Sequence, residues 1–422
     1  MRKSSSDVLV VGVALFAMFF GAGNLIFPPF MGMAAGSAWT AALLGFLVTG
    51  IGMPLLGIVA SARAGGSVEH LAGRVGPRFA RLLSIVIILA IGPLLAIPRT
   101  CATTFELGVL PIAPWFNAAL FSVVYFGVTL YFSINKSTVV DKIGKILTPF
   151  LLLTLAWIIV KGVVAPLGPL VDLGLDRPFA RGFREGYQTM DAMASVVFAE
   201  IVIGALVFKG YREGAQQVKL TSLAGVIAAV GLGLVYGGLM YVGATGATRF
   251  PAGIERTQLV VAISQALLGE TGKVALGLAV ALACLTTSIG LTATVGDYFS
   301  GLSKGRVGYK AICVATVVFS GIFAIVGVTT IVRVAVPLLV TVYPVVIVLI
   351  LLTVAGVRHR GVYTGAVTAA LAVGLLDAFT AAGLPIAPAN AVVSHIPFAA
   401  GGFPWIIPAV AGGALGLMLP KK

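Results

Sequence analysis

Helix-breaking residues fall in the middle of the first long apolar run, which reads LFAMFFGAGNLIFPPF. Gly21, Gly23 and Asn24 interrupt this run, and Pro28 and Pro29 follow about one turn later. Glycine lowers helix stability by about 1 kcal/mol and an interior proline by about 3 kcal/mol, so a helix break is expected here. Amides freed by a break inside a bilayer need a polar ligand or an ion. A close helix–helix contact through small residues is the alternative interpretation.

Three consecutive hydroxyl residues form a second suggestive pattern, in the later run LACLTTSIGLTATVGDYF. Thr286, Thr287 and Ser288 follow one another in this run. In a helix such hydroxyls commonly donate to a carbonyl one turn earlier, and this would be a purely local role. Alternatively, two hydroxyls and a nearby carbonyl bind a hard cation such as sodium, with carbonyls freed at the first break completing the shell.

A weaker counterpart of the first break lies in the run YQTMDAMASVVFAEIVIGALVF. Asp191 opens this run, and Ser195, Ala199 and Glu200 interrupt its apolar character. If the first five runs and the next five are repeats, this sixth run corresponds to the first. Because five is odd, the second repeat is inverted. Inverted repeats with matching broken helices are typical of secondary transporters.

The elements that position these residues are predicted to be membrane-spanning helices. The chain is 59% hydrophobic and 10% charged, with a mean hydropathy of +1.08, which excludes a soluble enzyme, a nucleic-acid-binding protein and a disordered chain. A spanning helix needs about 20 apolar residues, and the alternation of a membrane β-barrel is absent. We therefore predict an all-α polytopic membrane protein with about twelve spans, near residues 8–30, 38–60, 81–100, 117–134, 144–165, 188–208, 222–245, 273–295, 309–328, 333–355, 362–381 and 402–420.

Basic residues set the predicted orientation of these spans. Most of the 28 Lys and Arg residues lie in loops that share a side with the N-terminus, so both termini are expected in the cytoplasm. The net charge of +14 thus follows from topology rather than from nucleic-acid binding. The longest outer loop is predicted to be either a short amphipathic surface helix or a solvated linker. The expected organisation is a first inverted repeat (1–165), this outer linker (166–187), a second inverted repeat (188–356) and two further helices (357–422).

Five segments resemble the bacterial branched-chain amino acid:cation symporters, which are the BrnQ-type carriers of the LIVCS family. They are FGAGNLIFPPF, GPLLAIPRTCATTFE, VDKIGKILTP, GYQTMDAMASVVF and ACLTTSIGLT, in that order over nearly the whole chain. The resemblance implies a LeuT-type fold with ten core helices in two inverted repeats and two extra helices. It also implies sodium-driven uptake of leucine, isoleucine and valine by alternating access in the bacterial cell (inner) membrane.

The resemblance further implies roles for particular residues. The coupling sodium is expected to bind the carbonyls of Ala17, Phe20 and Ala283 and the hydroxyls of Thr286 and Thr287. The substrate site is expected to combine the backbone amides of the first break, which meet the substrate carboxylate, with an apolar pocket on the sixth and eighth helices. Its residues are Gly21, Ala22, Gly23, Asn24, Phe198, Ala199 and Ile289.

Two positions in the sixth helix depart from the pattern expected of this fold. Ala199 stands where some LeuT-type carriers have a hydroxyl for a second sodium, so we expect one sodium ion. Glu200 is an intramembrane carboxylate, which is a functional hypothesis by default. Proton coupling through Glu200 is therefore an alternative to sodium coupling, and a protonated, hydrogen-bonded structural role is another.

Other classes of function find less support in the sequence. An ion channel is a further alternative, but no selectivity-filter repeat is visible. A nucleophile–base pair, a phosphate-binding motif and a metal cluster are also absent from the sequence pattern, so we do not expect an enzyme. The expected partners are the amino acid and the lipid bilayer. We expect no organic cofactor, no nucleic acid and no obligatory protein partner.

Overall fold

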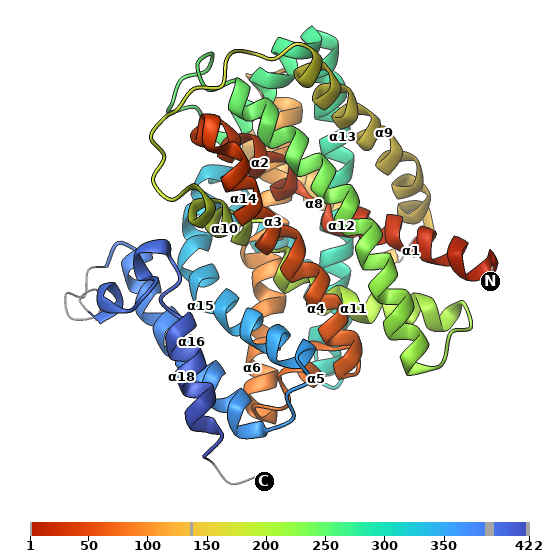
Figure 1. Ribbon diagram of the computed structural model, residues 1–422. Coiled ribbons are helices and arrows are strands. Elements are labelled where there is room, and N and C mark those ends of the chain that lie inside the picture. Colours follow the sequence, from red (N-terminus) through yellow and green to blue (C-terminus); the bar gives the residue numbers. More distant parts are fainter. Residues whose placement is uncertain (1, 136–137, 385–391, 419–422) are drawn as a thin grey trace.

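The computed structural model describes residues 2–135, 138–384 and 392–418 (Figure 1). Over these ranges the chain forms helices and no β-strand, which confirms the all-α prediction. Long apolar segments become helical because lipid offers the backbone no hydrogen-bond partner, so each segment must satisfy its own amides and carbonyls. The elements that position the site are α1 (Arg2–Phe19), α2 (Ala22–Ala35), η1 (Gly36–Ala38), α3 (Trp39–Leu47), η2 (Val48–Gly52), α4 (Met53–Ala64), α5 (Val68–Ala72), α6 (Pro77–Leu89), η3 (Ala90–Leu94), α7 (Ala96–Thr104), η4 (Phe105–Val109), α8 (Ala118–Asn135), α9 (Thr138–Val164), α10 (Pro178–Tyr187), α11 (Asp191–Phe208), α12 (Gly214–Thr245), α13 (Arg256–Leu302), α14 (Tyr309–Ala324) and α15 (Val328–Val354).

Three elements follow at the C-terminal end, namely α16 (Arg360–Ala381), η5 (Ala399–Gly401) and α18 (Ile406–Gly416). α16 and α18 lie side by side at the edge of the molecule (Figure 1). Glycines allow this approach, since a Cβ added at Gly365 would lie 2.0 Å from the carbonyl oxygen of Gly412. Such contacts between small residues are a common way for membrane helices to pack.

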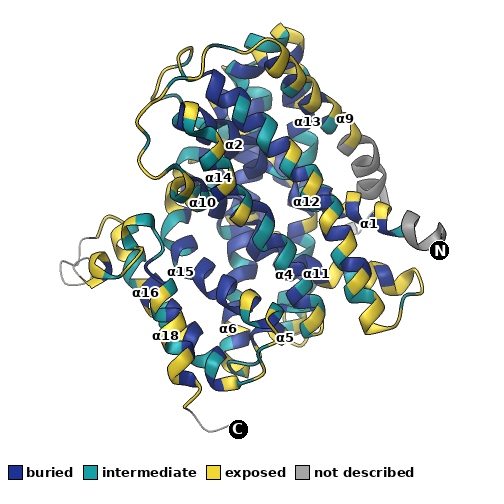
Figure 2. Cartoon of the chain, viewed as in Figure 1, coloured by how far each residue is buried: buried dark blue, intermediate teal, exposed yellow. Residues whose placement is uncertain are grey.

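Seven helical stretches are long and apolar enough to cross a membrane within the described part of the chain. Five further apolar helices are shorter, so the number of twelve spans stays a prediction. Large apolar side chains on the outer helices face outward, such as Leu234 on α12 (73% exposed) and Val123 on α8 (71% exposed). In contrast, α15 is mostly buried (Figure 2). This pattern suits a protein surrounded by lipid, where outward apolar side chains carry no cost.

The first span is interrupted where the sequence predicts it. α1 ends at Phe19 and α2 begins at Ala22, so Phe20 and Gly21 lie between two helices. Pro28 and Pro29 do not break the chain again, because α2 continues through both of them. The two glycines and Asn24, rather than the two prolines, therefore coincide with the interruption.

The third span bends in its middle. A π-turn, η3, separates α6 from α7, and within it Gly92 has non-helical angles (φ −95°, ψ −124°) just before Pro93. Proline lacks the amide that would continue the helical ladder, which explains a bend at this point. The bend precedes α7, which is almost entirely buried and carries Arg99 toward the centre of the molecule.

The sixth span differs from the sequence expectation. α11 is a regular helix through Ser195, Ala199 and Glu200, so no interruption lies at these residues. The interruption comes earlier, at residues 188–190, where Met190 takes a left-handed conformation (φ 63°) between α10 and α11. Ser195, Ala199 and Glu200 interrupt the apolar pattern of the sequence, but the backbone hydrogen bonds of α11 continue through them.

Within the outer loop of the sequence analysis, Pro178–Tyr187 form the helix α10, as the helical alternative expected, but this helix packs against α3 instead of lying free on the surface. α10 lies against α3 near the centre of the molecule (Figure 1). The two backbones touch, since a Cβ added at Gly182 would lie 1.9 Å from the carbonyl oxygen of Ala42. Figure 1 and these contacts show a packed helix that leads directly into the interruption before α11.

α13 is the longest helical stretch, and it carries the three hydroxyl residues. It bends at Gly269, which has a positive φ of 68°. α13 packs against α2, α7, α8 and α9, so this helix of the second half of the chain contacts four helices of the first half. The predicted cation-binding segment of α13 thus lies beside the helix that follows the first break.

Candidate functional site

The break in the first span exposes backbone groups that a continuous helix would bond internally. In a continuous helix the carbonyl of Ala17 would accept the N–H of Gly21. That N–H instead donates to Oδ1 of Asn24, at 3.0 Å. The Ala17 carbonyl thus loses its helical donor. Phe20 lies outside both helices, although its N–H still donates to the carbonyl of Phe16 at 2.8 Å. The break therefore supplies both free carbonyls and the amides that begin α2.

Asn24 joins the first interruption to the second. Its Nδ2 donates to Oδ2 of Asp191 at 2.6 Å and to the hydroxyl oxygen of Tyr236. The Tyr236 hydroxyl also donates to the same carboxylate oxygen, at 3.3 Å. All three side chains are buried. Asn24 thus fixes the start of α2 to the start of α11, and a single polar cluster joins the two interruptions to α12.

The hydroxyl-bearing segment of α13 lies beside this break, with the methyl group of Thr287 toward Gly21. Oγ1 of Thr286 and Oγ1 of Thr287 both donate to the carbonyl of Ala283, at 2.9 and 3.0 Å. The Cγ2 of Thr287 lies 4.0 Å from the position that a Cβ on Gly21 would take. These bonds are the local ones of the simpler interpretation, and they also gather three oxygens beside the break. Ser288 points elsewhere, since its hydroxyl lies 3.3 Å from that of Thr129 on α8.

The residues predicted to line the apolar pocket are buried. The ring of Phe198 on α11 lies 5.6 Å from that of Phe19 at the end of α1, measured between centroids. Phe20 stacks on Phe16 at 5.5 Å, so aromatic rings surround the C-terminal end of α1. Ala199 follows on α11 with no exposed surface. Ile289, which is also buried, lies on α13 where its carbonyl accepts a hydrogen bond from Ser133 of α8 at 3.3 Å.

Glu200 lies apart from the polar cluster of the two interruptions. It is the first exposed residue of α11, after a fully buried stretch from Asp191 to Ala199. No residue in the described ranges is hydrogen-bonded or ion-paired with it. The structure thus gives Glu200 an exposed position and no hydrogen-bonded structural role among the described residues.

A cavity of about 510 Å³ lies elsewhere, between α7, α8 and α13. None of the predicted site residues lines it. Two carboxylates line it, Glu106 and Glu255, and Glu106 accepts hydrogen bonds from the hydroxyl of Thr257 (2.6 Å) and the N–H of Val328 (2.9 Å). No group of three His, Cys, Asp or Glu side chains capable of holding a metal occurs in the described ranges. The candidate site is therefore the paired interruptions and the adjacent segment of α13.

A family model for branched-chain amino acid transport proteins matches residues 4–422. The chain belongs to this family. Among the curated members, the branched-chain amino acid permease BraB of Bacillus subtilis (strain 168) is 38% identical over 424 residues, which cover 98% of this chain and 95% of the relative. A branched-chain amino acid transport protein is a membrane transporter and not an enzyme, as the sequence analysis expected.

Solved structures show the fold of this branched-chain amino acid transport protein. MhsT in complex with L-phenylalanine is similar with a TM-score of 0.59 and 16% identity, covering 97% of this chain and 98% of that one. Mhp1, a nucleobase-cation-symport-1 family transporter in a closed conformation with bromovinylhydantoin bound, gives a TM-score of 0.62 and 16% identity, covering 97% and 91%. Both are LeuT-fold transporters, so the predicted fold type is confirmed.

The sequence analysis did not single out one buried charged residue of this family member. Arg99 falls at the edge of the predicted span 81–100. In the structure it lies in α7 with only 4% of its surface exposed. The available signal was a single arginine between Pro98 and Thr100 in an otherwise apolar segment. An intramembrane charge of this kind is a functional candidate by default.

Proposed function

We propose that this transporter is a secondary symporter that imports leucine, isoleucine and valine together with sodium by alternating access. The observation that carries the proposal is the position of Thr287 beside Gly21 at the first break. The Thr286 and Thr287 hydroxyls and the Ala283 carbonyl form an oxygen cluster on α13. The carbonyls of Ala17 and Phe20, released at the break, would complete a shell of hard oxygen ligands for one sodium ion.

The amino acid would bind on the other side of the same break. Of the three amides expected to meet the carboxylate, those of Ala22 and Gly23 lie in the first turn of α2, where helix N-termini favour a carboxylate. The N–H of Gly21 is already donated to Oδ1 of Asn24. An apolar side chain would lie among the buried residues near Phe198 and Ala199. One methylene in such a pocket is worth only about 1–3 kcal/mol, so a broad specificity for branched-chain residues is expected.

Alternating access would use the two halves of the fold. We propose that residues 1–165 and 188–356 form inverted repeats, with 357–422 outside this core. α10, from the intervening segment 166–187, would supply the outer half of the sixth span, because it leads into the interruption at 188–190. The distribution of Lys and Arg supports a bacterial inner-membrane protein with both termini in the cytoplasm.

Uptake of radiolabelled leucine into proteoliposomes tests this function. An inward sodium gradient is compared with an inward proton gradient and with no gradient, and unlabelled isoleucine and valine are added as competitors. We expect sodium-driven accumulation that both competitors suppress. Uptake that follows the proton gradient alone would refute sodium coupling and favour Glu200, whose exposed carboxylate is the alternative coupling group.

A further inference from the structure

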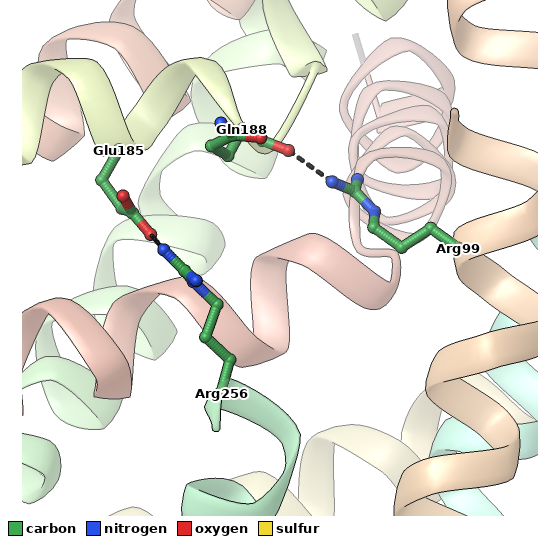
Figure 3. A network of polar contacts seen from close by, with 4 residues as sticks. All are labelled: Arg99, Glu185, Gln188 and Arg256. Atoms are coloured by element: carbon green, nitrogen blue, oxygen red, sulfur yellow. Dashed lines mark hydrogen bonds and ion pairs between the residues drawn. The ribbon is translucent and has the colours of Figure 1, made fainter. Parts of the chain in front are cut away.

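Arg99 presents a charged group to the start of α2. Its guanidinium lies against Gly23, because a Cβ added there would lie 2.8 Å from Nη2 and 3.2 Å from Cζ. Nη1 donates to the backbone carbonyl of Gln188 at 2.6 Å, at the second interruption (Figure 3). Nε has no hydrogen-bond partner although it is buried. Arg99 therefore touches both helix interruptions and keeps part of its hydrogen-bonding capacity unused.

Two positive features meet at this point. The first turn of α2 carries the positive end of a helix dipole, and the Arg99 side chain adds a full charge next to it. No carboxylate in the described ranges lies within 4 Å of the Arg99 guanidinium. Asp191 acts on it only from a longer distance, and its Oδ2 is already bonded to Asn24 and Tyr236. A buried charge without a carboxylate partner is costly, so the arrangement favours an anion beside Arg99 and the first turn of α2.

Arg256, which lies near the same phenylalanine as Arg99, has a carboxylate partner for its guanidinium. Its Nη2 and Nε donate to Oε1 of Glu185, at 3.0 and 3.2 Å, as Figure 3 shows beside Arg99. Both arginines lie near the ring of Phe27, with Cζ 5.4 Å from the centroid for Arg99 and 5.7 Å for Arg256. Both arginines thus pack on Phe27, and among the residues that the structure describes only Arg256 has a carboxylate partner. We therefore assign a structural role to Arg256 and consider Arg99 a candidate for ligand binding.

We propose that Arg99 binds the carboxylate of the transported amino acid, together with the backbone amides at the start of α2. The inference rests on the proposed function and adds to it a side-chain ligand on the third span. A guanidinium presents several N–H donors in a fixed fork that matches a carboxylate. A ligand with the same side chain and amine, but without the carboxylate, then loses the contact with Arg99.

Binding of leucine and of leucinamide to the purified protein, in detergent with sodium present, tests this role. The probe is radiolabelled leucine, displaced by unlabelled leucine or leucinamide. Wild-type protein is expected to prefer leucine, and Arg99→Gln is expected to weaken leucine binding by about tenfold or more, as for loss of a charge-assisted hydrogen bond. The affinity of Arg99→Gln for leucinamide, measured directly by calorimetry, is expected to differ from that of wild type by less than about threefold. Arg256→Gln is the matched control and should keep the wild-type preference.

A folded Arg99→Gln protein that keeps the wild-type ratio of leucine to leucinamide affinity would overturn the role of Arg99. If this variant does not fold, Arg99→Lys decides, since it retains the charge and loses the planar fork. A lower preference for leucine in Arg99→Lys supports the proposal, and an unchanged preference overturns it. Wild-type protein that binds no leucine at all would instead refute the proposed function, so the two failures are distinguishable.

Discussion

Replacing one hydroxyl of α13 should weaken sodium binding without unfolding the protein. Thr287→Val removes the hydroxyl and keeps the shape of the side chain, including the methyl group that faces Gly21. The lost hydrogen bond to Ala283 is a local one within the helix, at 3.0 Å, and the helical backbone bonds remain. Stability should therefore change by less than about 0.5 kcal/mol, as for replacements that disturb no tertiary contact.

The loss in sodium affinity is expected to be larger than this change in stability, because a partly buried ligand oxygen disappears. A hydrogen bond or ligand contact to a charged group is worth about 1.5–3 kcal/mol, and about 2 kcal/mol corresponds to about a 30-fold weaker affinity. Thr287→Ser retains the hydroxyl and should stay within about threefold of wild type. The assay is the sodium concentration that gives half-maximal leucine uptake into proteoliposomes.

The same helix offers a matched control. Thr294 donates to the carbonyl of Gly290 at 2.9 Å, in the same local geometry, but its hydroxyl belongs to an exposed bond away from the break. Thr294→Val should leave the sodium dependence unchanged. The reasoning is refuted if Thr287→Val and Thr294→Val shift the half-maximal sodium concentration equally, or if neither shifts it.

Three further changes test other parts of the account. Asn24→Leu removes the two hydrogen bonds that Asn24 makes to Asp191 and Tyr236, and should lower the free energy of unfolding by about 3 kcal/mol, measured by chemical unfolding in detergent micelles. Wild-type stability of this variant would contradict the link between the two interruptions. Gly243→Ala places a Cβ 2.0 Å from a backbone oxygen of α2 and should cost about 1–3 kcal/mol in the same assay, whereas Gly204→Ala meets nothing within 4 Å and serves as the control; equal stabilities would contradict the close packing of α2 on α12. Glu200→Gln should keep sodium-driven leucine uptake within about twofold of wild type, and abolished uptake would favour proton coupling.

The break in the first span could be predicted from the sequence because its cause is local. Gly21 and Asn24 both disfavour a helix interior, and the Asn24 side chain takes over the N–H of Gly21. The hydroxyl segment of α13 was also identifiable, since Thr286 and Thr287 are adjacent in the chain. What the sequence left undecided was whether these two segments meet, because that depends on packing between distant helices.

The second interruption and the buried arginine needed tertiary structure. Residues 188–190 carry no glycine or proline, and Met190 adopts its left-handed conformation where α10 packs against α3 and the chain turns into α11. Arg99 lies at the edge of the predicted span 81–100, so the apolar pattern alone places it at a span end. Its burial follows from the bend at Gly92, which the apolar pattern does not reveal.

The central claim is that one break binds both sodium and the amino acid, and reciprocal binding tests it most directly. Leucine affinity is measured calorimetrically on purified protein at several sodium concentrations, and sodium affinity at several leucine concentrations. Coupled sites must raise each other's affinity by the same factor, which we expect to be about tenfold or more and to shrink in Thr287→Val. Leucine affinity that is equal in sodium and in choline, and that instead changes with pH, would contradict the claim.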